Sequence, residues 1–61
     1  MSTMTIEIEM NNAAFEDAPE REVARILREL ADRVEVRGVG SVDEVRLRDI
    51  NGNSVGGVVI S

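Results

Sequence analysis

The chain has 61 residues, of which 43% are hydrophobic and 31% are charged, a composition typical of one small folded domain. Cysteine and histidine are absent, which excludes disulfides, thiol chemistry, the commonest metal ligand and the commonest acid–base catalyst. The net charge of −5 disfavours binding to a nucleic-acid backbone, because such binding needs a basic surface.

Residues 3–10 alternate between apolar and polar side chains, which predicts a half-buried β-strand. The apolar face of this strand consists of Met4, Ile6, Ile8 and Met10. The polar face carries Thr5, Glu7 and Glu9. We interpret the two glutamates as solvated charges, because a small sheet offers no deep pocket for acid–base chemistry.

An amphipathic helix is predicted over about residues 18–33. Its apolar stripe consists of Val23, Ile26, Leu27, Leu30, Ala31 and Val34. Asp17 and Glu20 have the spacing of a capping box, and Pro19 suits the first helical turn. Gly38 and Gly40 mark the end of the helical segment.

The last third of the chain predicts a hairpin, with strands over about residues 42–50 and 53–60 joined by Asn51-Gly52. This turn places Leu47 opposite Gly56 and Val45 opposite Val58. The core-facing set is then Val45, Leu47, Val58 and Ile60, and the outer set is Glu44, Arg46, Arg48, Val55 and Val59. Gly56-Gly57 indicates a bulge or a close approach of another element.

These elements predict an α+β fold with β-α-β-β order, a single domain over residues 1–61 in which one helix packs on a three-stranded sheet. Two strand orders remain open, 1-3-2 and 1-2-3, and we favour the first because it makes every neighbouring pair antiparallel. A domain this small buries a modest core, so we also expect a homodimer, formed through a free sheet edge or the uncovered sheet face.

Two segments share features with known types of ligand site. Residues 49–53 (DINGN) share the acidic start of a calcium-binding loop, but the glycine comes too early and Ile60 occupies the place of the final glutamate. We interpret this segment as a hairpin turn capped by Asp49. The glycines lack the lysine and the strand-to-helix setting of a phosphate loop. We therefore predict no catalytic residues, no metal site and no cofactor, and a protein that is not an enzyme.

The outer sheet face is the predicted interface, and its candidate residues are Arg46, Arg48, Val55, Val59, Glu7 and Glu9. A protein partner of unknown identity is the favoured occupant. Nucleic-acid or nucleotide binding through Arg46 and Arg48 is the alternative, although the stacking aromatic residues that such sheets use are missing. No membrane contact is expected, because the longest uncharged stretch, residues 50–61, is too short and too polar to cross a bilayer.

Three segments together resemble a family of small uncharacterised proteins from tailed bacteriophages and prophages. They are residues 11–17 (NNAAFED), 22–33 (EVARILRELADR) and 47–53 (LRDINGN) with Val55-Gly56. The resemblance implies an accessory protein that binds and modulates a host or phage protein, with counter-defence among the possible roles. It implies no active-site residue. Because residues 1–4 lack the pattern of a signal peptide, the expected location is the cytoplasm of an infected or lysogenic bacterium.

Overall fold

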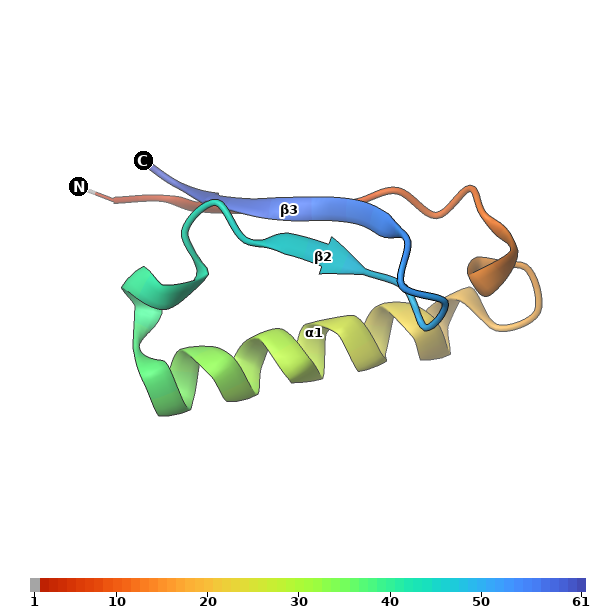
Figure 1. Ribbon diagram of the computed structural model, residues 1–61, viewed down its shortest axis with the longest axis horizontal. Helices are drawn as coiled ribbons and strands as arrows, with labels where there is room; N and C mark the ends of the chain where they lie inside the picture. The colour runs from red at the N-terminus through yellow and green to blue at the C-terminus, as the bar shows by residue number, and fades with distance from the viewer. Residues whose placement is uncertain (1) are drawn as a thin grey trace.

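The computed structural model describes residues 2–61 of the chain, and Met1 lies outside the described part. Its elements are β1 (Met4–Ile8), the 3-10 helix η1 (Ala13–Phe15), α1 (Pro19–Arg37), the 3-10 helix η2 (Val39–Val42), β2 (Arg46–Arg48) and β3 (Ser54–Ile60). They form two layers, with α1 packed along one face of the sheet (Figure 1). The expected α+β fold is confirmed.

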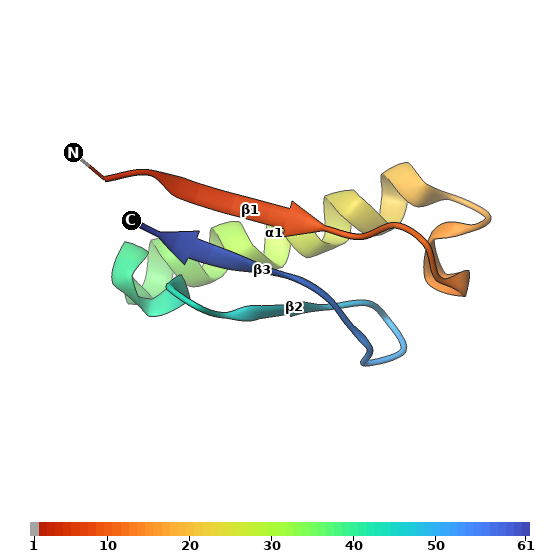
Figure 2. The same cartoon turned by 90° about the horizontal axis from the view of Figure 1, so that it is seen from above.

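The sheet has the strand order β1-β3-β2, and both neighbouring pairs are antiparallel. This confirms the favoured 1-3-2 order and places β3 in the centre. The strands β1 and β2 therefore form the two edges of the sheet, as Figure 2 shows from above. None of the helices in residues 2–61 has both the length and the apolar character needed to cross a membrane.

The helix α1 differs from its prediction at both ends. The expected cap by Asp17 is wrong, because the N-cap residue is Ala18 and makes no side-chain capping bond. Pro19 occupies the first helical position, where its missing N–H is not needed. The helix continues past the predicted end at residue 33 because no helix breaker precedes Gly38. That glycine has a φ of 92°, which side-chain-bearing residues rarely adopt, and it ends the helix.

The edge strand β2 is much shorter than the predicted strand over residues 42–50. Glu44 has a φ of 60°, so the backbone leaves the extended conformation before β2 begins. Val42 lies instead in η2, where it is fully buried. The predicted pairing of Val45 with Val58 is nevertheless present just before β2, because the Val58 N–H donates to the Val45 carbonyl at 3.0 Å. The Ile60 N–H donates to Asp43 Oδ1, also at 3.0 Å.

The hairpin has the predicted register because two differences from the predicted hairpin, a longer loop and a bulge, compensate each other. The Gly52 N–H donates to the Asp49 carbonyl at 3.0 Å and the Asp49 N–H to the Asn53 carbonyl at 2.9 Å, which makes a three-residue loop rather than the predicted two-residue turn. This loop pairs Arg48 with Ser54, whereas the next pair is Leu47 with Gly56. Val55 is thus an extra residue in β3, and this bulge restores the predicted register.

The bulge also reorients Val55 toward the core. Strict alternation predicts that Val55 shares the outer face with Val59, and this expectation is wrong, because Val55 is only 5% exposed and belongs to the core cluster. A bulge re-aims the side chain of its extra residue, which is the physical reason. The buried apolar residues of the core are Phe15, Ile26, Leu30, Val42, Leu47, Val55 and Val58.

Candidate functional site

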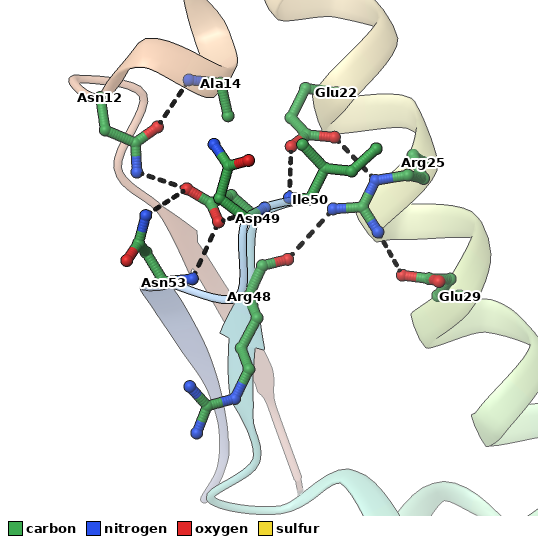
Figure 3. A network of polar contacts seen from close by, with 10 residues as sticks. Asn12, Ala14, Glu22, Arg25, Glu29, Arg48, Asp49, Ile50 and Asn53 are labelled. Atoms are coloured by element: carbon green, nitrogen blue, oxygen red, sulfur yellow. Dashed lines mark hydrogen bonds and ion pairs between the residues drawn. The ribbon is translucent and has the colours of Figure 1, made fainter.

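A buried polar network lies where η1, α1 and the hairpin loop meet (Figure 3). Asp49 is its centre, with only 4% of its surface exposed. Its Oδ1 atom accepts the backbone N–H groups of Asn51 at 2.9 Å and Asn53 at 2.8 Å. Its Oδ2 atom accepts the side-chain amide groups of Asn12 at 2.7 Å and Asn53 at 3.3 Å. The interpretation of Asp49 as the cap of the hairpin turn is confirmed.

Glu22 joins the helix to the same loop. Its side chain is buried, and its Oε2 atom accepts the Ile50 N–H at 2.8 Å. Its Oε1 atom pairs with Arg25 Nε at 2.7 Å, and Arg25 also reaches Glu29 Oε2 at 2.7 Å. The Arg25 Nη2 atom also donates a hydrogen bond to the Arg48 carbonyl at 3.2 Å. The network therefore satisfies backbone groups of a loop that the sheet ladder leaves unpaired.

Hydrogen bonds hold both buried carboxylates in their ionised form. The Arg25 side chain and then the Ile50 N–H lower the pKa of Glu22 below its ordinary value, against the opposing effect of desolvation. For Asp49, burial taken alone raises the pKa, but the bonds from Asn53, Asn12 and Asn51 together outweigh burial and lower it. Both groups thus act as fixed anionic acceptors in the folded state.

Sequence reasoning missed the role of Glu22, although a signal for it exists. Glu22 lies four residues before Ile26, so it occupies the same helix face as the buried stripe. A carboxylate on a buried face needs a partner, and the nearest loop supplies one. Across residues 2–61, no group of three or more His, Cys, Asp or Glu side chains is arranged to hold a metal ion.

Four of the six candidate interface residues gather on the outer face of the sheet. Glu7 and Arg46 each pair with Gly57, from β1 and β2 respectively, so they flank a position without a side chain. Glu9 and Val59 line the same hollow, and Val59 is 53% exposed. We call these four residues, Glu7, Glu9, Arg46 and Val59, the outer-face hollow. It has charged groups around an exposed apolar side chain.

The other two candidates contribute no exposed side chain to the outer-face hollow. Val55 lies along the hollow but is only 5% exposed and packs in the core. Arg48 is exposed, but its Nη1 atom donates to the Gly52 carbonyl at 3.1 Å, which engages its guanidinium in the hairpin loop. Figure 3 shows the Arg48 side chain directed away from the Glu22–Arg25 pair, although the Arg48 carbonyl faces Arg25. The predicted pairing of Arg46 and Arg48 as one basic surface is thereby weakened.

A second exposed surface, which sequence reasoning missed, follows the free edge of β1. Met4 is 36% exposed and Ile6 is 40% exposed, although both were assigned to the core face. The helix explains this exposure, because α1 crosses the sheet obliquely and leaves the amino end of β1 uncovered (Figure 2). Met10 and Leu27 are exposed as well.

Comparison of the chain with protein-family models, with curated proteins and with solved structures finds no match. The resemblance to bacteriophage accessory proteins therefore remains a prediction, and the functional argument depends on the surfaces described above.

Proposed function

We propose that this domain is a non-enzymatic protein-binding module that works as a homodimer. Following the resemblance described above, we propose that it is a phage-type accessory protein, cytoplasmic in its bacterial host, which binds and modulates a host or phage protein. The observation that carries the binding role is the outer-face hollow, where an exposed valine lies among three charged side chains. Apolar groups within a charged rim are the usual anatomy of a protein interface.

The charge of the outer-face hollow indicates the chemistry of its target. Glu7 lies in β1 and Glu9 follows directly after it, whereas Arg46 comes from the opposite edge of the sheet across Gly57. A target that inserts an apolar side chain beside Val59 and presents a basic group to the glutamates would be complementary. The buried carboxylates Asp49 and Glu22 contribute to the fold instead, since their oxygens already accept bonds from the loop and from Arg25.

Nucleic-acid binding through Arg46 and Arg48 has less support. The Arg48 guanidinium donates to the Gly52 carbonyl, and Arg46 shares its face with Glu7 and Glu9. A phosphate backbone would meet two carboxylates beside one free arginine, in a chain of net charge −5.

Affinity capture from host lysate, with and without nuclease, tests the binding role. The tagged wild-type protein is compared with Val59→Asp, and Ile50→Asp is the control because Ile50 is exposed at the distant hairpin loop. We expect one protein target that survives nuclease, is retained by Ile50→Asp and is lost with Val59→Asp. Loss of the captured material after nuclease would contradict the proposal and favour the nucleic-acid alternative. Light scattering at micromolar concentration tests the homodimer independently.

A further inference from the structure

We infer that the homodimer forms by antiparallel pairing of β1 with β1 of a second copy, with Ile6 on the two-fold axis, to give one continuous six-stranded sheet. This inference rests on the proposed homodimer and specifies its interface. It selects the β1 edge over the outer sheet face, which the sequence left as an open alternative.

The backbone of β1 is free to make this pairing. Thr3 and Ser61 exchange two backbone hydrogen bonds, at 2.7 and 3.0 Å. The Glu9 N–H donates to the Val55 carbonyl at 2.7 Å. The backbone N–H and C=O groups of the odd-numbered residues therefore point toward β3 and form its hydrogen bonds, because these groups alternate direction along a strand. The N–H and C=O groups of Met4, Ile6 and Ile8 then point away from β3, toward the open edge.

One register suits a second copy better than its neighbours. With Ile6 opposite Ile6 of the second copy, Met4 lies opposite Ile8 and Thr5 lies opposite Glu7. Each glutamate then faces a threonine, and the apolar side chains form one ladder on the inner face. Sliding by two residues in one direction places Glu7 against Glu7 of the second copy, where like charges repel. Sliding in the other direction places Ile8 opposite Ser2, which precedes the strand.

The oblique helix makes the two copies complementary in shape. The amino-terminal part of α1 lies at the carboxyl end of β1, and the amino end of β1 has no helix over it (Figure 2). An antiparallel second copy brings the carboxyl end of its own β1, with the helix segment beside it, next to Met4. The exposed side chains of Met4 and Ile6 thereby gain apolar neighbours. Reciprocal cover of this kind is characteristic of a two-fold interface.

Lysine substitution tests this interface, with a matched control. Ile6→Lys places two ammonium groups at the axis and should raise the dimer dissociation constant on the order of 100-fold or more. Ile50→Lys makes the same change at an exposed loop residue and should leave the dimer unaltered. Sedimentation equilibrium gives the constants, and circular dichroism establishes that each variant is folded.

Disulfide trapping provides a second test that does not depend on the folding of the lysine variant. The chain has no cysteine, so Ile6→Cys introduces a single thiol. In the proposed register Ile6 and Ile6 of the second copy form a hydrogen-bonded pair, whose Cα atoms lie about 5.5 Å apart, within the range of a disulfide. We expect Ile6→Cys to give a covalent dimer under mild oxidation and Ile50→Cys to give none at equal concentration.

The outcomes separate this inference from the proposed function. If the wild type is a dimer, Ile6→Lys is monomeric and Ile6→Cys is trapped, the β1 edge is the interface. If the dimer survives Ile6→Lys and Ile6→Cys is not trapped, the inference is overturned while the homodimer stands. A monomeric wild type at about 100 μM, far above the range of a specific functional dimer, would overturn both the inference and the proposed homodimer. The capture experiment still tests target binding in either case.

Discussion

The two edges of the sheet solve the problem of unpaired backbone groups in opposite ways. The β2 edge has three strand residues, follows a positive-φ glutamate and is opposite a bulge, and its arginines are charged. Each of these features discourages a further strand from pairing. The β1 edge has five residues in regular register, with no proline, lysine or bulge. The contrast indicates that one edge is built to remain an edge and the other is available for pairing.

The two edges also differ in what completes them within the monomer. Buried carboxylates from α1 and the loop satisfy the hairpin end of β2, whereas Met4 and Ile6 at the β1 edge remain 36% and 40% exposed. The polar network is therefore complete within the monomer, whereas Met4 and Ile6 at the β1 edge keep exposed apolar surface that the proposed dimer would bury.

Substitution of Gly56 should have the largest effect, because this residue lies in β3 between the two edges. A Cβ atom at Gly56 would overlap the backbone carbonyl oxygen of Glu7, which cannot move without breaking the β1 ladder. We expect Gly56→Ala to cost at least about 3 kcal/mol of unfolding free energy, measured by urea denaturation. Gly40→Ala is the control, with open space around its Cβ and an expected change within about 1 kcal/mol. Equal losses in both variants would contradict the close approach of β1.

Asp49→Ala should have the next largest effect and should act at the β2 side. The change leaves the N–H groups of Asn51 and Asn53 without their acceptor inside the loop. We expect a large fall in the melting temperature, measured by circular dichroism. Asp43→Ala is the matched control, since the Asp43 carboxylate accepts one bond, from the Ile60 N–H, at an exposed site. A loss at Asp43 equal to that at Asp49 would show that burial of the network contributes little.

The stability of the β2 side should fall in acid. The folded-state pKa values of Glu22 and Asp49 are lowered, so their contribution to stability is fully present above the ordinary carboxyl range near about pH 4. It is lost as the pH falls through the lowered folded-state values, because the unfolded chain then binds protons more readily. Urea midpoints between about pH 2 and 7 measure the effect. Glu22→Gln should give a shallower pH dependence, and an unchanged profile would argue against the pair with Arg25.

Val59→Lys should have the smallest effect and distinguishes the sheet face from the sheet edge. Val59 is exposed on the outer face, where a lysine side chain can extend into solvent. We expect the unfolding free energy to change by less than about 1 kcal/mol. The dimer dissociation constant should not change. A monomeric Val59→Lys variant would assign the dimer interface to the outer face and contradict pairing through β1.

Local sequence patterns were sufficient for the order and type of the three strands and the long helix, but not for the 3-10 helices η1 and η2. Alternation identified β1, the apolar stripe identified α1, and Gly38 ended the helix as its lack of a Cβ allows. The pairing of Leu47 with Gly56 was also correct. These features depend on the period of the side chains and on backbone freedom, which neighbouring residues in the chain largely determine.

Contacts between distant segments decided the rest. The bulge that buries Val55, the burial of Glu22 against the hairpin loop and the shortening of β2 at Glu44 all involve residues whose own pattern predicts something else. The exposure of Met4 and Ile6 depends on the angle at which α1 crosses the sheet. The periodicity of the residues therefore fixes where the strands and the long helix form and which of their faces are apolar. Which apolar face stays partly exposed depends on how the helix packs across the sheet, because coverage is a property of two elements together and not of either element alone.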